Sequence, residues 1–232
     1  MSVRSLFVTG TDTGVGKTFV TCAIAAALRE GRRDVGVMKP IASGCTRGPD
    51  GHLSSEDADL LIEASVTGDP MDLVMPVAFE PPLAPSAAAR ESGISFDRHK
   101  VMAAYKTLAE KHEILLVEGV GGLLVPLDGR YTVRDLISDM HADVLVVSRD
   151  ALGTINHTAL TIESVRAAAL EVVGVVLNAP SADPSDVSSA TNAEEIERLA
   201  RVAVLARVGP SADYREAARA LPQRLIEAVL GE

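Results

Sequence analysis

A glycine-rich stretch near the start of the chain contains the residue types that bind phosphate. Residues 10 to 18 read Gly-Thr-Asp-Thr-Gly-Val-Gly-Lys-Thr and lie between an apolar run, Leu6 to Thr9, and an Ala-rich apolar segment. Glycines in a strand-to-helix turn let consecutive backbone N–H groups point at an anion, and the helix adds the positive end of its dipole. Lys17 can pair with the β- and γ-phosphates of a nucleotide, and the Thr18 hydroxyl can bind magnesium. The stretch therefore predicts a phosphate-binding loop.

The spacing within this loop differs from that of the commonest nucleotide-binding motif. Where that motif has its first glycine, this chain has Thr11, and its own first glycine is Gly10. An ordinary glycine-rich turn is the alternative interpretation. The sequence Gly-Lys-Thr at the junction of a strand and a helix favours a variant phosphate loop.

Three more candidates for phosphate chemistry lie farther along the chain. Lys39 follows one apolar run, and Glu118 follows another and precedes several glycines. A lysine in such a place can stabilise a transferring phosphoryl group, and a carboxylate can help to hold its metal ion. The alternatives are a solvated lysine and a carboxylate that faces water. Asp57, in the first turn of a helix predicted to start at Ser55, either joins the metal site or only complements the helix dipole.

The elements that must position these residues are strands alternating with helices. The predicted strands are 6–9, 34–38, 73–79, 113–117, 143–148, 172–177 and 202–206, and the predicted helices are 17–30, 55–64, 86–91, 96–111, 131–140, 152–169, 193–200 and 213–230. Residues 41–45 are predicted to be a loop and residues 180–193 a mobile loop. We therefore predict one domain over residues 1–232, a doubly wound α/β fold with a mainly parallel sheet and helices on both faces.

Such a sheet would bring the candidate residues together. Ligands bind beyond the carboxyl ends of the strands in open α/β sheets. Different predicted strands lead to Lys17, to Lys39, to Glu118, to Gly153 with Asn156, and to Asn178. We expect all of them to converge at one edge of the sheet.

Composition narrows the class of partner. The net charge is −10, which disfavours a nucleic-acid partner because a phosphate backbone would be repelled. No run of 18 apolar residues occurs, and Arg4 is the sole basic residue before the first predicted strand, so we expect a cytoplasmic protein without a membrane partner. The five histidines are scattered, and none is interpreted as a metal ligand.

Five motifs occur together in the order seen in the dethiobiotin synthetase family, which this chain resembles over about residues 3 to 178. They are Gly-Thr-Asp-Thr-Gly-Val-Gly-Lys-Thr from Gly10, Lys-Pro-Ile-Ala-Ser-Gly from Lys39, Val-Glu-Gly-Val-Gly-Gly from Val117, Leu-Gly-Thr-Ile-Asn-His from Leu152, and the strand-end Asn178. The resemblance implies an ATP- and magnesium-dependent ligase of biotin synthesis. Such an enzyme makes dethiobiotin from 7,8-diaminopelargonic acid and CO2 through a carbamate and a carbamic-phosphoric anhydride.

The resemblance also implies roles for individual residues. Lys17 and Lys39 would be catalytic, and Thr18, Asp57 and Glu118 would surround the magnesium ion. Ser43 would contact the diamine, while Gly153, Thr154 and Asn156 would bind its carboxylate across a homodimer interface. The residues expected to bind ATP are Asp12, Thr13, Gly14, Val15, Gly16, Lys17, Thr18, Phe19, Asp57, Glu118, Gly119, Val120, Gly121, Asn178, Gly209 and Pro210.

Other classes of protein remain as alternatives. A regulatory ATPase of the partition or septum-site kind would act as a nucleotide-switched dimer. Such proteins usually carry a second lysine early in the loop, where this chain has Thr11, and the septum-site kind has a basic C-terminal amphipathic helix, whereas residues 221–230 contain one basic residue, Arg224. A ligase of the cobyrinic acid type would need a glutaminase domain. A binding module would not need a metal carboxylate.

Overall fold

Six parallel strands form the central sheet. The computed structural model describes residues 4–179 and 186–232, and the strands of this sheet run in the order β12-β11-β10-β1-β7-β2. Every neighbouring pair is parallel. The strands are β1 (Arg4–Gly10), β2 (Val35–Met38), β7 (Ile114–Gly122), β10 (Asp143–Arg149), β11 (Val172–Asn178) and β12 (Val204–Val208). All six carboxyl ends therefore lie along one edge, as predicted.

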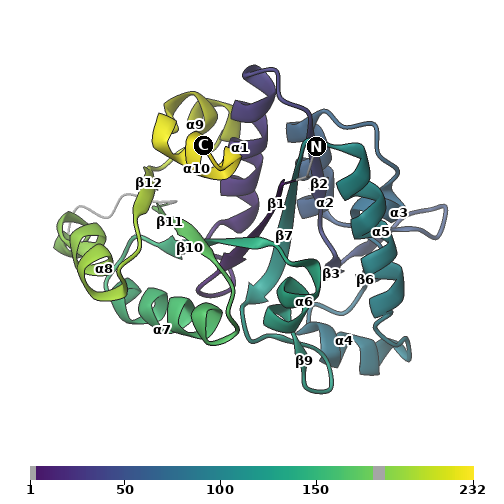
Figure 1. Cartoon of the computed structure of the whole chain (residues 1–232). Helices are drawn as coiled ribbons and strands as arrows, with labels where there is room; N and C mark the ends of the chain where they lie inside the picture. The colour runs from purple at the N-terminus through teal and green to yellow at the C-terminus, as the bar shows by residue number, and fades with distance from the viewer. Residues whose placement is uncertain (1–3, 180–185) are drawn as a thin grey trace.

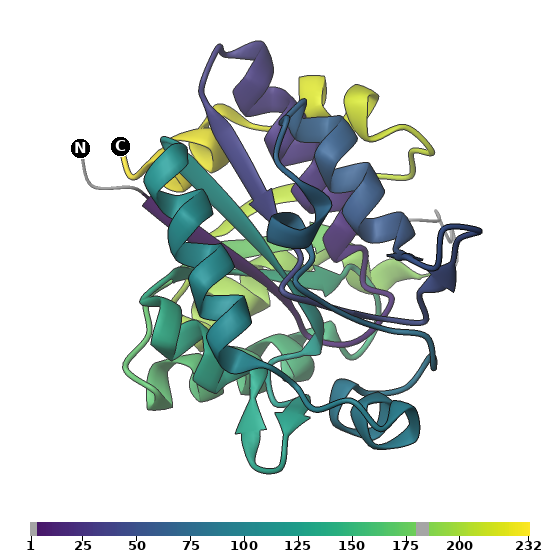
Figure 2. The ribbon, with the colours of Figure 1, turned by 90° about the vertical axis from the view of Figure 1, so that its right-hand side faces the viewer.

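Helices cover both faces of this sheet (Figure 1). One face carries α1 (Lys17–Glu30), α2 (Glu56–Ser65), α9 (Tyr214–Ala220) and α10 (Gln223–Leu230), and the other carries α5 (Arg98–Lys111), α6 (Val133–Met140), α7 (Thr154–Ala167) and α8 (Asn192–Ala200). Figure 2 shows α1 and α2 side by side on the first face. Side chains alternate along a strand, so Leu6 and Val8 enter one core and Phe7 enters the other. Burial on both faces explains the apolar runs and confirms the doubly wound fold.

Several segments differ from the prediction. The predicted helix 213–230 is divided into α9 and α10, the predicted helix 131–140 begins with a short strand, Tyr131–Thr132, and two segments between residues 41 and 79 also differ. The predicted loop 41–45 contains β3 (Ile41–Ser43), which pairs in parallel with β6 (Val77–Phe79). The predicted strand 73–79 is divided, because α3 (Met71–Val74) occupies its first part. Pro70 and Pro76 flank this short helix, and a proline is tolerated at a helix start but ends a helix in front of it. The remaining small elements are β4 (Thr46–Arg47), β5 (Leu53–Ser54), α4 (Pro85–Ser92), β8 (Pro126–Asp128) and β9 (Tyr131–Thr132).

The region after β11 contains more regular structure than its composition predicts. Part of the predicted mobile loop, residues 180–185, lies outside the described residues. Val187–Ala190 form a 3₁₀ helix, η1, and α8 already begins at Asn192. The Asp186 carboxylate accepts a hydrogen bond of 2.9 Å from the Ser188 amide, a local side-chain contact that initiates such a turn. At α2, by contrast, the predicted cap Ser55 makes no capping hydrogen bond with its side chain among the described residues.

Strand β7 continues beyond its predicted end. Glu118 was expected at the tip of the strand, but β7 runs on to Gly122, and its register against β1 shifts between Val8 and Gly10. A Cβ at Gly119 would lie 2.8 Å from Cε1 of Phe7. The absence of a side chain at Gly119 therefore leaves room for the Phe7 ring, so β7 can pass close to β1.

A buried charged cluster lies at the amino ends of β2 and β7, opposite the predicted site. The Asp69 carboxylate, which is fully buried, accepts hydrogen bonds from Thr67 and Lys111, and its Oδ2 lies 2.7 Å from His112 Nε2. The other ring nitrogen of His112 lies 3.0 Å from Asp34 Oδ1. Burial raises the pKa of Asp69, but the hydrogen bonds from Lys111, Thr67 and His112 outweigh burial and hold that pKa below its ordinary value.

Replacing Asp69 with asparagine should lower the free energy of unfolding by about 3 kcal/mol at neutral pH, because His112 and Lys111 lose a buried partner. The folded-state pKa of Asp69 is depressed, so its contribution is complete above the unfolded value of about 3.9 and is lost as pH falls through the folded value. We therefore expect urea titrations to show a smaller difference in the free energy of unfolding between the variant and the wild type at pH 3 than at pH 7. Glu195→Gln is the control. It removes an exposed ion pair with Arg198 and should leave the free energy of unfolding unchanged at both pH values. An equal loss at both pH values would contradict this interpretation.

Candidate active site

The phosphate loop connects β1 to α1. Gly14 and Gly16 have positive φ angles of 72° and 91°, and helix α1 begins at the next residue, Lys17. The Lys17 side chain is buried and its Nζ donates a hydrogen bond of 3.1 Å to the carbonyl oxygen of Asp12. Burial, with a smaller contribution from Lys39, lowers the pKa of Lys17 to about 8. A bound phosphate would relieve this cost, so the loop is suited to an anion.

Lys39 lies between the two carboxylates predicted to hold a metal ion. Its Nζ donates hydrogen bonds of 2.5 Å to Glu118 Oε1 and 2.7 Å to Asp57 Oδ2. The Thr18 hydroxyl lies 2.8 Å from Asp57 Oδ1 and 2.9 Å from Glu118 Oε1. The structure therefore joins Thr18, Lys39, Asp57 and Glu118 in one cluster. For Asp57, which local sequence left ambiguous, these contacts favour a place in the site over a purely helix-capping role.

The charges in this cluster depend on one another. Burial alone would lower the pKa of Lys39, but Glu118 and Asp57 outweigh it and raise that pKa above its ordinary value. Burial likewise would raise the pKa of Asp57, and Lys39 outweighs it and lowers that pKa. Lys39 and Asp57 are therefore held in their charged forms.

The donor set fits a magnesium ion. The Oε2 atom of Glu118 is buried and has no hydrogen-bond partner among the described residues, and an unpaired buried oxygen is costly. In residues 4–179 and 186–232, no three His, Cys, Asp or Glu side chains are grouped to hold a metal ion by themselves. Magnesium at a nucleotide site usually takes one or two carboxylates together with the substrate phosphates and water. Thr18, Asp57 and Glu118 match that requirement.

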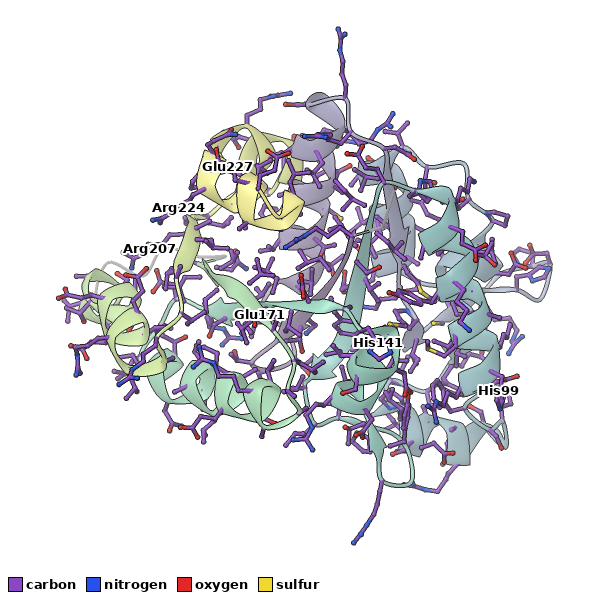
Figure 3. All side chains as sticks on the ribbon, viewed as in Figure 1. His99, His141, Glu171, Arg207, Arg224 and Glu227 are labelled. Atoms are coloured by element: carbon purple, nitrogen blue, oxygen red, sulfur yellow. The ribbon has the colours of Figure 1, made fainter. Side chains whose placement is uncertain are left out.

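The ends of β11 and β12 lie beside the phosphate loop. The Asn178 side chain is buried, and its Nδ2 donates a hydrogen bond of 2.9 Å to the carbonyl oxygen of Val15. Asn178 pairs with Val208 of β12, the strand on which Figure 3 labels Arg207, and the exposed Gly209 and Pro210 follow directly. Asn178, Gly209 and Pro210, which the resemblance predicts to bind ATP, therefore occupy adjacent strand ends.

Among the described residues, those predicted to bind the diamine make no hydrogen bond to the Lys39 cluster. Gly153, at the N-cap of α7, and Asn156 are exposed. The Thr154 hydroxyl is buried, 2.6 Å from Ser148 Oγ, which lies 3.2 Å from Thr11 Oγ1. This chain of hydroxyl groups connects the start of α7 to the phosphate loop. Ser43 ends β3 and is partly exposed, without a side-chain bond to Lys39 among the described residues.

Other predicted contacts stabilise the loop or the core. Gly121 has a φ of 60°, and a Cβ there would lie 3.4 Å from the Thr13 hydroxyl of the loop. Val120 packs against the core on the α5 face, and Phe19 packs against the core on the α1 face. Arg149 was not among the predicted site residues, and its Nη2 lies 3.5 Å from the carbonyl oxygen of Gly14. The rule that identified Lys39, a charged residue after a buried strand, would also have identified Arg149.

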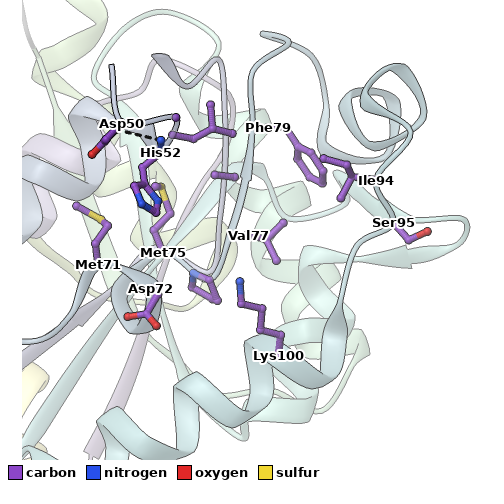
Figure 4. Close-up of a pocket in the computed structure, with 14 residues that line it drawn as sticks. Asp50, His52, Met71, Asp72, Met75, Val77, Phe79, Ile94, Ser95 and Lys100 are labelled. Atoms are coloured by element: carbon purple, nitrogen blue, oxygen red, sulfur yellow. Dashed lines mark hydrogen bonds between the residues drawn. The ribbon is translucent and has the colours of Figure 1, made fainter. Parts of the chain in front are cut away.

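Two cavities are relevant to a small substrate. One, of about 420 Å³, lies against the phosphate loop and is lined by Thr11, Asp12 and Thr13 together with residues 122–126 and part of α7. The other, of about 770 Å³, lies beside β6 and is lined by Met71, Met75 and Lys100 among others (Figure 4). Its lining residues all differ from those predicted for the site. The smaller cavity is therefore the better candidate for a substrate of phosphoryl transfer.

No helix in the described part of the chain is both long enough and apolar enough to span a bilayer.

Solved structures with a similar fold include a ParA family ATPase from Chlorobium tepidum TLS, with a TM-score of 0.53 at 14% identity over 100% of this chain and 98% of that one. The septum site-determining protein MinD from Pyrococcus horikoshii OT3 has a TM-score of 0.53 at 17% identity, over 98% and 93% of the two chains. At these identities the likeness concerns the fold alone.

Sequence relatives are much more similar. A family model described as an AAA domain matches residues 4–218. The ATP-dependent dethiobiotin synthetase BioD of Anaeromyxobacter dehalogenans (strain 2CP-C) is 47% identical over 79% of this chain and 81% of its own. The protein of that name from Anaeromyxobacter sp. (strain Fw109-5) is 43% identical over 96% and 97%, and that from Bacillus subtilis (strain 168) is 40% identical over 79% and 78%. The resemblance noted from the motifs is confirmed, and the chain belongs to the ATP-dependent dethiobiotin synthetase family of ligases.

Proposed function

We propose that this chain closes the cyclic urea of dethiobiotin from 7,8-diaminopelargonic acid, CO2 and ATP. One amine of the substrate takes up CO2 as a carbamate, and a carbamate oxygen attacks the γ-phosphorus of ATP, releasing ADP. The neighbouring amine then attacks the carbonyl carbon of the mixed anhydride, so the ring closes and phosphate leaves. The observation that carries this proposal is the Lys39 ammonium group in contact with Asp57 and Glu118 beside the phosphate loop.

The residues of the cluster divide this work. Lys17 would bind the β- and γ-phosphates, and Lys39 would neutralise charge on the carbamate and on the transferring phosphoryl group. Thr18, Asp57 and Glu118 would hold magnesium, which would supply further positive charge at the phosphates. Asn178, Gly209 and Pro210 would bind the adenine base, and the backbone of residues 12–19 and 119–121 would surround the phosphates.

The diamine would lie against the phosphate loop in the cavity of about 420 Å³. Ser43 would contact it from one side, and Gly153, Thr154 and Asn156 of a second copy would bind its carboxylate. Leu124 and Leu160, each more than half exposed, flank this cavity, which supports a homodimer that buries them. Activity per chain should then fall on dilution, as the dimer dissociates.

We also propose that residues 1–232 act as one domain, because a single sheet carries the phosphate loop, Lys39, Glu118 and Asn178. A cytoplasmic location would suit a reaction that consumes ATP.

The deciding experiment measures ADP release with the diamine and bicarbonate supplied together and separately. We expect release only when both are present together with magnesium, and dethiobiotin formed in equal amount. ATP turnover indifferent to the diamine, but stimulated by lipid or a protein partner, would instead favour a regulatory ATPase. Only the distant fold likeness supports that alternative, and Thr11 occupies the position of its second lysine.

A further inference from the structure

Asp150, the residue after β10, connects the ends of three strands beside the proposed base site. We propose that Asp150 is a positioning residue for adenine, one that sets the preference for ATP over other nucleotides through Arg207 and Asn178. The proposal rests on the proposed function in one respect, because it takes Asn178 and residues 209–210 to be the base side of the site.

The first connection runs to β12. Oδ2 of Asp150 accepts hydrogen bonds from Arg207, 3.1 Å from Nε and 2.8 Å from an Nη nitrogen. The Asp150 side chain is 6% exposed and that of Arg207 is 42% exposed. Both nitrogens donate to the same oxygen, and a hydrogen bond between charged groups is stronger than one between neutral groups. Arg207 lies two residues before Gly209, so its pair with Asp150 positions the end of β12 and the residues after it, which are proposed to contact the base.

The second connection runs to β11. The Asp150 amide donates a hydrogen bond of 2.9 Å to the carbonyl oxygen of Asn178, and the Ala179 amide donates one of 2.8 Å to the carbonyl oxygen of Val208. These bonds hold the backbone on both sides of the Asn178 side chain. The third connection comes from α8, where Asn192 Nδ2 donates a hydrogen bond of 2.9 Å to Asp150 Oδ1. Both carboxylate oxygens of Asp150 are therefore used, one by β12 and one by α8, while its backbone amide bonds β11.

This arrangement separates the base from the phosphates. Hydrogen-bonded recognition of one base over another depends on placing donors and acceptors accurately, and a small displacement loses much of the discrimination. The phosphates are held by the loop before α1. Among the described residues the Asp150 side chain makes no hydrogen bond to this loop, and its backbone partner Asn178 contacts the loop through the bond from Nδ2 to the Val15 carbonyl oxygen. Removing the hydrogen bonds of the Asp150 side chain should therefore weaken the contacts to the base, which distinguish one nucleotide from another. The contacts to the phosphates, which all nucleotides share, should be kept.

The test is a binding titration of the full chain with ADP and with GDP. Asp150→Asn should weaken ADP binding about tenfold and leave GDP binding within about twofold, so that the preference for adenine narrows. At saturating ATP the turnover number should be unchanged while KM for ATP rises. Arg207→Met should have the same effect, and the double variant should be no worse than either single variant, because both remove one interaction.

Arg198→Met is the matched control, since it removes an exposed pair with Glu195 on α8 and should leave both affinities unchanged. Equal weakening of ADP and GDP by Asp150→Asn, or no weakening of either, would overturn the inference. If Asp150→Asn does not fold, the more exposed Arg207→Met variant provides the same test. A wild-type chain that binds ADP no more tightly than GDP would count against the proposed function, whereas selective wild-type binding kept in both variants would count against Asp150 alone.

Discussion

Replacing Lys39 with alanine should lower the turnover number about a thousandfold and change the affinity for ADP far less. Lys39 is buried and contacts both carboxylates of the cluster, so its ammonium group would act from a fixed position that is shielded from water. Removing one such preorganised charge typically costs a factor of about 10² to 10³. ADP lacks the phosphoryl group that Lys39 would neutralise, which is why binding and turnover should separate. The measurement is steady-state ADP release at saturating diamine, bicarbonate and ATP, with an ADP titration beside it.

The control for this variant is Lys39→Arg, which keeps a positive charge between Asp57 and Glu118 but alters its position. It should fold like the wild type and remain slow, because geometry as well as charge is needed. Lys111→Ala also removes an ion pair with a buried carboxylate, Asp69, but at the opposite end of the sheet. This variant should keep the turnover number of the wild type. Near-normal turnover in Lys39→Ala would remove Lys39 from the mechanism.

Gly16→Ala should weaken ADP binding about a hundredfold. The Gly16 φ angle of 91° is one that L-residues rarely adopt, and a Cβ there would lie 2.0 Å from Nδ2 of Asn178. Left-handed strain and overpacking together cost about 3 kcal/mol, which corresponds to a factor of about 100 in affinity. Isothermal titration with ADP measures it directly.

Gly14→Ala provides the matched control within the same loop. Gly14 has a φ angle of 72°, but the nearest atom to a Cβ there is Nη2 of Arg149 at 4.0 Å. The Gly14→Ala variant should have the backbone strain but no steric clash with Asn178, so its affinity for ADP should fall about tenfold. Equal losses in the two variants would show that contact with Asn178 is not what makes Gly16 necessary.

The sequence predicted the sheet well because its strands are buried on both faces and read as uninterrupted apolar runs. It also predicted which residues meet, since Lys39, Glu118 and Asn178 each occupy or follow a strand end, and parallel strands bring such ends to one edge. Glu118 shows a limit of this reasoning, because β7 continues past it to Gly122. Whether a strand continues through glycines depends on the neighbouring strand, here β1 with its Phe7 ring, rather than on local propensity.

Other features depended on contacts between distant segments. Asp57 could not be assigned from its helix position alone, because its partner Lys39 comes from a different strand. β3 is three residues long, too short for periodicity to identify, and it pairs with β6, which the sequence predicted as part of a longer strand. Asp150 follows β10 as Lys39 follows β2, but the role proposed for it depends on Arg207 and Asn192, which are more than 40 residues away.

The contact of Lys39 with two carboxylates has a consequence for how the chain matures. The Lys39 ammonium group contacts both carboxylates, Asp57 and Glu118, so positive charge lies against them before any ligand arrives. An internal counter-ion thus stands in for the cation that buried carboxylates would otherwise need during folding. We therefore expect a newly made chain to fold whatever the cellular supply of divalent cations, and to need magnesium only once a nucleotide binds.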